Sequence, residues 1–203
     1  MRLDCRSREF QYFPFDPQGY KLVLVNSKVK HELVGSPYND RRQSCENVVA
    51  ALNKQFPDKK YETLRDATWA ELDAVKGAVS EEDYKRAHFV LGEKDRVLAV
   101  SDALEAGDYE TVGKKMYETH DGLSKEYEVS CEELDYLVDI ARENGVTGSR
   151  IMGGGFGGCT INLVKDEVYD KFIADAKKKF CAKYGHEPEV YPVVISDGSH
   201  KVC

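Results

Sequence analysis

Long apolar runs and an excess of positive charge are both missing from this 203-residue chain. The uninterrupted apolar stretches, such as the four residues 22–25, do not exceed about five residues, whereas a membrane-spanning helix needs roughly 20. Acidic residues outnumber basic ones by 36 to 29, so the formal net charge is −7 and no basic surface for nucleic acid or an anionic membrane is expected. The charged residues that follow Met1 contain no apolar segment of the kind found in signal peptides. We therefore expect a cytoplasmic globular protein that binds neither nucleic acid nor membranes.

Paired cysteines are missing as well. The six cysteines are scattered, without a CxxC pair and without histidines at metal-ligand spacing. This distribution argues against a zinc site or a disulfide framework and favours reduced thiols, as expected for a cytoplasmic chain. The cysteines are Cys5, Cys45, Cys131, Cys159, Cys181 and Cys203. The sequence thus assigns no metal ligand.

The pattern of apolar residues predicts one compact α+β unit. Residues 20–25 form an apolar run interrupted only by Lys21, which is typical of a strand covered on both faces. Further strands are predicted over 149–152, 159–164 and 191–195, with helices between them. The resulting βαββαβ order is that of a ferredoxin-like layer, with a helical insertion after its first strand.

Helical spacing dominates the rest of the chain. Apolar residues three and four positions apart predict a helix over 39–56, a helical layer over 63–122 and a helix over 166–184. Ser130 and Glu133 have the spacing of a capping box, which predicts that one more helix begins at Ser130.

The most specific motif is a glycine-rich loop between two predicted strands. Residues 153–158 read Gly-Gly-Gly-Phe-Gly-Gly, and each glycine in an ordered element costs roughly 0.5–1 kcal/mol of backbone entropy. A P-loop is excluded because no Gly-Lys-Ser/Thr follows, and a dinucleotide fingerprint is excluded because a strand comes next. What remains is a backbone nest that can lie beside a phosphate, or a flexible hairpin turn. The candidate phosphate-adjacent glycines are Gly153, Gly154, Gly155, Gly157 and Gly158.

This loop resembles the third signature of the GHMP kinase superfamily, in the form found in galactokinases. The resemblance covers nearly the whole chain in order. Its matching stretches are residues 3–7, 26–33, 36–42 with 45–46, 86–88 with 92–93, 127–135 and 148–160. It implies a GHMP kinase C-terminal domain over residues 20–203. Residues 1–19, with a single strand predicted over the alternating stretch 3–13, would then be the tail of the N-terminal kinase domain.

The resemblance also implies a function. A galactokinase-like sugar kinase converts ATP and galactose to ADP and galactose 1-phosphate, with an aspartate facing the sugar and a phosphate loop holding ATP with Mg²⁺. The family signatures that carry those parts lie upstream of residue 1, so no catalytic and no metal residue is assigned. The chain is expected to be the C-terminal half of the enzyme, to be inactive alone, and to need its own N-terminal half as partner. Two alternatives stay open, namely a sister sugar 1-kinase of the superfamily and a non-catalytic homologue that senses sugar and ATP.

One sugar contact of the family maps onto this chain, the tyrosine of the Ser-x-Tyr-Asn loop, here Tyr38. Its hydroxyl can hydrogen-bond a ring hydroxyl of the substrate, and the alternative is a partly buried tyrosine at the entrance of the helix over 39–56. Met152 stands where the family usually has threonine and Gly122 where it often has serine, so hydroxyl contacts are not carried over to these positions.

The other polar candidates are interpreted as structural. The histidines lack a carboxylate or cysteine at ligand spacing and are interpreted as structural or solvated. They are His31, His88, His120, His186 and His200. Arg41 and Arg42 stay open between contact with an anion and salt bridges to Asp40 or Glu46. Cys159 is interpreted as a small packed residue because no base accompanies it in the sequence.

Overall fold

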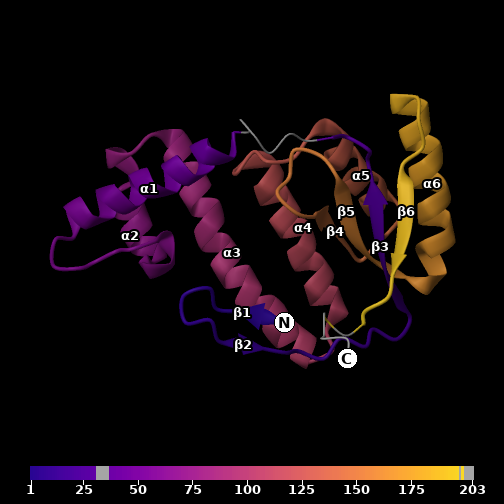
Figure 1. Cartoon of the computed structure of the whole chain (residues 1–203), viewed down its shortest axis with the longest axis horizontal. Helices are drawn as coiled ribbons and strands as arrows, with labels where there is room; N and C mark the ends of the chain where they lie inside the picture. The colour runs from indigo at the N-terminus through magenta and orange to yellow at the C-terminus, as the bar shows by residue number, and fades with distance from the viewer. Residues whose placement is uncertain (31–36, 197, 199–203) are drawn as a thin grey trace, which may run out of the picture.

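A four-stranded antiparallel sheet forms one part of the molecule, as the computed structural model of residues 1–30, 37–196 and 198 shows (Figure 1). Its strands are β3 (Tyr20–Asn26), β4 (Gly148–Ile151), β5 (Cys159–Lys165) and β6 (Glu189–Val193). They follow the order β4-β5-β3-β6, and every neighbouring pair is antiparallel. The ferredoxin-like layer predicted from the sequence is confirmed, with β6 two residues earlier than expected.

Helices cover the sheet and extend from it. Their bounds are α1 (Tyr38–Gln55), α2 (Trp69–Ala74), α3 (Glu81–Glu105), α4 (Tyr109–Lys125), α5 (Glu132–Glu143) and α6 (Asp166–Tyr184), with short 3-10 turns η1 (Leu64–Asp66) and η2 (Lys76–Ala78). The predicted helix over 39–56, the helical layer over 63–122 and the helix over 166–184 are all present. No helix in the described part of the chain is long and apolar enough to cross a membrane.

The two faces of the sheet pack against different helices because side chains alternate along a strand. Val23 and Val25 on β3 are fully buried in a cluster with α5 and α6. Leu22 and Leu163 point the other way and pack with residues of α3 and α4. A separate apolar cluster joins α1 to α2 and α3, away from the sheet (Figure 1). The described chain therefore contains a sandwich of helices and sheet with a helical extension beside it.

The single strand predicted over residues 3–13 is wrong. The segment is a hairpin of β1 (Arg2–Leu3) and β2 (Phe10–Gln11), paired antiparallel and lying beside α3 (Figure 1). Asp4 turns the chain because its carboxylate accepts the backbone N–H groups of Arg6 at 2.8 Å and Ser7 at 3.1 Å. Such an Asx turn reverses the chain where alternation alone suggests continuity.

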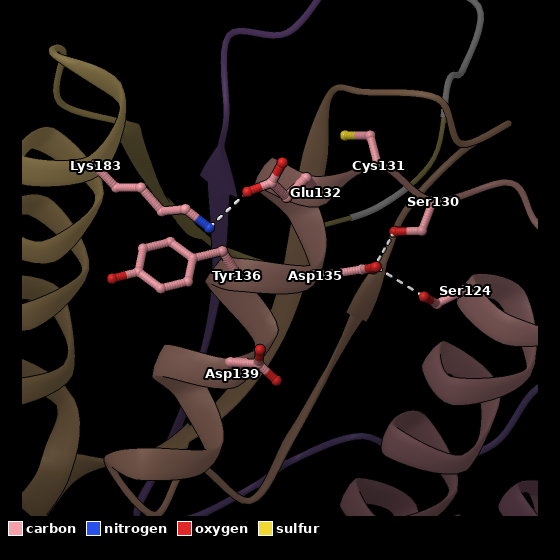
Figure 2. A pocket seen from close by; sticks show the side chains of 8 residues that line it. All are labelled: Ser124, Ser130, Cys131, Glu132, Asp135, Tyr136, Asp139 and Lys183. Carbon is pink, nitrogen blue, oxygen red and sulfur yellow. Dashed lines mark hydrogen bonds and ion pairs between the residues drawn. The ribbon is translucent and has the colours of Figure 1, made fainter.

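The capping box predicted at Ser130 is also wrong. Helix α5 begins at Glu132 with Cys131 at its N-cap, and the side chain of Cys131 makes no capping hydrogen bond. The Ser130 hydroxyl instead donates to Asp135 at 2.5 Å, and Ser124 donates to the same carboxylate at 2.8 Å (Figure 2). A carboxylate one turn into the helix has therefore replaced the backbone N–H as the partner of Ser130.

The thiols agree with the expectation of an unbridged chain. The five cysteines within the described residues, Cys5, Cys45, Cys131, Cys159 and Cys181, are free, and Cys203 lies outside those residues. Among the described residues there is also no group of three or more His, Cys, Asp or Glu side chains placed to hold a metal ion.

Candidate functional site

The glycine-rich loop joins β4 to β5, so it is the connection of an antiparallel hairpin. Its backbone is far from an ordinary turn, because φ is 83° at Gly153, 82° at Gly155, 143° at Gly157 and 84° at Gly158. Side chains disfavour this left-handed region, so glycine is required at these positions by conformation alone. Phe156, with φ of 60°, adopts it as well.

Two glycines are also required by close approach of protein backbone. A Cβ atom at Gly155 would lie 2.1 Å from the carbonyl oxygen of Val129, and one at Gly157 would lie 2.6 Å from that of Val29. The same carbonyls hold the loop, because Val129 accepts the N–H of Phe156 at 2.7 Å and Val29 accepts the N–H of Gly158 at 3.1 Å. Hydrogen bonds from two distant segments of the chain thus hold the loop in place, and we call the Val29 and Val129 carbonyls the seat of the loop.

The tip of the loop is open. A Cβ atom at Gly153 or Gly154 would meet nothing within 4 Å. Within the residues that the structure describes, no carbonyl oxygen accepts the amide N–H of either glycine. Successive amides of this kind can face an anion such as a phosphate.

Arg41 connects the loop region to α1. Its side chain is buried and donates to backbone carbonyls, from Nε to Tyr127 at 2.9 Å and from the guanidinium nitrogens to Glu128 at 2.5 Å and Pro37 at 3.3 Å. Burial, and then the nearby Arg86 charge, lower the pKa of Arg41 from its usual value. Its guanidinium also lies 5.8 Å from the centre of the Phe156 ring.

The sequence left open whether Arg41 and Arg42 contact an anion or form salt bridges, and the structure shows that the two arginines differ. Arg41 holds backbone carbonyls, whereas the exposed Arg42 forms the predicted ion pair with Glu46 at 2.8 Å. Sequence reasoning did not single out Glu128 or Arg86, which lie beside Arg41. Both residues lie in stretches that carry the family resemblance, but the resemblance gives neither of them a role. Arg86 also interrupts the apolar stripe of α3 next to Ala87.

Tyr38 is the first residue of α1 and is half exposed. It lies three residues before Arg41, so both side chains are on one face of the helix. Because Arg41 binds the carbonyls of Tyr127 and Glu128 and lies beside Phe156, the first turn of α1, which contains Tyr38, lies near the glycine loop. The fold therefore brings Tyr38 and the glycines into one region. Residues 31–36, including His31, lie outside the described residues, as does His200.

A polar cavity of about 410 Å³ lies along α5, with Ser124 of α4 on one side and Lys183 of α6 on the other (Figure 2). Most of the polar side chains that line it take part in hydrogen bonds or ion pairs. Asp135 accepts from Ser124 and Ser130 and lies 3.3 Å from Nε2 of the buried His120, and Lys183 contacts Glu132 at 2.7 Å. We interpret this cluster as structural.

The remaining residues interpreted from the sequence as structural or solvated are His88, His186 and Cys159. His88 is half exposed and contacts Glu126 at 2.7 Å through Nδ1. His186 is exposed. Cys159 begins β5, and burial raises the pKa of its thiol, which disfavours a nucleophilic thiolate.

Comparisons with known proteins agree with this architecture. A family model described as GHMP kinases C terminal matches residues 100–183. The chain is therefore similar to the C-terminal domain of GHMP kinases over this stretch, and its fold agrees with that similarity. The mevalonate kinase of L. major, at 20% identity and a TM-score of 0.50, shares the fold.

Galactokinases are similar to the chain along almost its whole length. Those of Clostridium acetobutylicum and Homo sapiens are 40% and 39% identical over 202 residues, which is 98% and 99% of this chain and 51% and 49% of theirs. The crystal structure of Lactococcus lactis galactokinase complexed with galactose has a TM-score of 0.90 at 28% identity and covers 98% of this chain and 51% of that one. The chain is homologous to the C-terminal half of galactokinases, and it spans about half the length of the curated relatives it matches.

Proposed function

We propose that this chain is the C-terminal half of a galactokinase-like sugar kinase, which transfers a phosphoryl group from ATP to galactose. The main support is the similarity to galactokinases over 98% of the chain, with a TM-score of 0.90 to one of them. The alternatives of a sister sugar kinase or a non-catalytic sensor have no comparable support. Residues 1–19 belong in this proposal to the N-terminal kinase domain and residues 20–203 to the C-terminal domain, and the enzyme is cytoplasmic.

In this proposal the chain binds and orients while its partner half supplies the catalytic groups. Tyr38 offers its hydroxyl to a ring hydroxyl of the sugar, and the open amides of Gly153 and Gly154 face a phosphate. Glycines 155, 157 and 158 hold the loop in shape. ATP bound with Mg²⁺ supplies the phosphoryl group, and the proposal assigns the Mg²⁺ ligands to the other half.

Replacing Tyr38 with phenylalanine tests the sugar contact. Loss of one hydroxyl hydrogen bond should weaken galactose binding by about 1 kcal/mol, or roughly fivefold, and leave the KM for ATP unchanged. Steady-state kinetics with each substrate varied would measure this in the active chimera described below. An unchanged galactose KM would remove Tyr38 from the site.

The proposed activity is best tested in a chimera. The equivalent half of Clostridium acetobutylicum galactokinase is replaced by this chain, so that the two halves are covalently joined. A coupled assay of ADP release with galactose and Mg-ATP should detect turnover by the chimera and none by the purified 203-residue chain. This follows because phosphoryl transfer depends on positioning and charge stabilisation by groups that the proposal assigns to the other half.

The controls separate the alternatives. The relative's remaining half alone should be inactive, and a panel of hexoses, arabinose and uronic acids should identify galactose as the preferred substrate. Robust turnover by the 203-residue chain alone would contradict its role as a half-enzyme. A folded chimera that binds both substrates without turnover would favour the sensor.

A further inference from the structure

Glu128 has a backbone conformation that its residue type disfavours. Its φ is 55°, in the left-handed region, where the chain leaves α4 and turns toward Val129. Glycine or asparagine is usual at such a position, so a glutamate there needs a compensating interaction.

Basic side chains from two helices supply that interaction. Arg41 of α1 donates to the Glu128 carbonyl at 2.5 Å. Lys85 and Arg86 of α3 contact the Glu128 carboxylate at 2.8 Å and 3.5 Å. Arg86 is itself buried, donates to Ser44 of α1 at 2.9 Å and pairs with Glu82. Two buried guanidinium groups therefore meet one glutamate at the junction of α1, α3 and α4.

The conformation of Glu128 sets the direction of the next carbonyl. Val129 accepts the N–H of Phe156 at 2.7 Å and lies directly against Gly155. The Glu128 turn and the seat of the glycine loop are thus consecutive peptide units. Arg41, which holds the turn, is also one helical turn from Tyr38.

We propose that Glu128, Arg41 and Arg86 are positioning residues that fix the glycine loop relative to Tyr38. The effect on sugar and phosphate binding rests on the proposed function, whereas the coupling of these residues to the loop does not. Glycine would adopt this backbone conformation more easily, but only a glutamate supplies the carboxylate that pairs with Lys85 and Arg86 of α3.

Amide hydrogen exchange on the 203-residue chain tests the coupling directly. Glu128→Gln keeps the shape of a half-exposed side chain and removes its charge, and Arg41→Lys keeps the charge but reaches fewer carbonyls. Each should accelerate exchange of the Phe156 amide on the order of tenfold, since a hydrogen bond to a charged group is lost. Exchange in the β3–β6 pairing should not change. Arg42→Lys, one residue away and exposed, is the matched control and should change neither the exchange of the Phe156 amide nor that of the β3–β6 amides.

A general loss of stability would instead accelerate exchange at both places together. Unchanged exchange at Phe156 in Glu128→Gln, or equal acceleration at Phe156 and in β3–β6, would overturn the proposal. In the chimera, Glu128→Gln should raise the galactose KM or lower kcat without lowering the Tm in proportion, while Arg42→Lys should do neither. Selective exchange at the loop in a chimera that has no activity even as wild type would support the coupling and count against the proposed kinase function.

Discussion

Gly113→Ala is expected to destabilise the chain by about 3 kcal/mol, because helix α4 crosses β4 with no room for a methyl group. A Cβ atom at Gly113 would lie 2.1 Å from the carbonyl oxygen of Thr147, and one at Gly148 would lie 2.4 Å from the Cα of Gly113. Alanine favours a helix over glycine by about 1 kcal/mol, which is too little to offset overlap with a backbone atom. For a chain of this size the Tm should fall by about 6–12 °C, as measured by circular dichroism or calorimetry.

Gly77→Ala provides the matched control. Gly77 lies in η2, outside the left-handed region, and a Cβ atom there would meet nothing within 4 Å. Its Tm should stay near that of the wild type. If Gly113→Ala were as stable as Gly77→Ala, the close crossing of α4 and β4 would be wrong.

Gly155→Val is expected to lower the activity of the chimera by roughly 100-fold or more, because a displacement of about 1 Å can cost that much in a positioned site. Valine disfavours φ of 82°, and its Cβ atom would overlap the Val129 carbonyl at 2.1 Å. The loop must therefore move away from its seat. The thermal stability of the protein should fall much less than its activity, since the loop lies outside the β4–β5 pairing. Steady-state kinetics and thermal unfolding of the Gly155→Val chimera would measure the loss of activity and the loss of stability on the same protein.

Gly154→Ala is the control within the same loop. Gly154 is not in the left-handed region, and a Cβ atom there has open space around it. Alanine should preserve both stability and the seat of the loop. Full activity of Gly155→Val would identify the loop as a simple connection and remove it from the proposed phosphate site.

Much of the fold could be predicted from local patterns. The apolar run within β3 and the periodic apolar residues of α1 and α6 predicted where these elements lie along the chain, because burial on one face or both imposes a pattern on the sequence. The hairpin at residues 2–11 was missed because one carboxylate, Asp4, turns the chain within an alternating stretch. The predicted start of α5 at Ser130 is wrong because the Ser130 hydroxyl donates to the Asp135 carboxylate and does not cap the helix.

The candidate site was predictable only in part. The glycine content of residues 153–158 and its resemblance to a kinase signature identified the loop, and the Ser-x-Tyr-Asn pattern identified Tyr38. The sequence did not indicate that Val29 and Val129 seat the loop, because hydrogen bonds from distant carbonyls leave no residue type as a signature. Glu128 was missed for the same reason, since its backbone conformation depends on cations from two other helices.

By itself, then, the sequence determined the order of the strands and helices from residue 20 onward, the acidic net charge and the presence of an unusual glycine loop, all of which follow from residue type and short-range spacing. Only the tertiary structure decided which glycines are required by close packing and which are open, and which of two adjacent arginines is buried. The physical reason is that steric contact and desolvation depend on what other segments bring near a residue. Arg41 and Arg42 are chemically identical neighbours, yet one holds the carbonyls beside the loop and the other holds Glu46 in solvent.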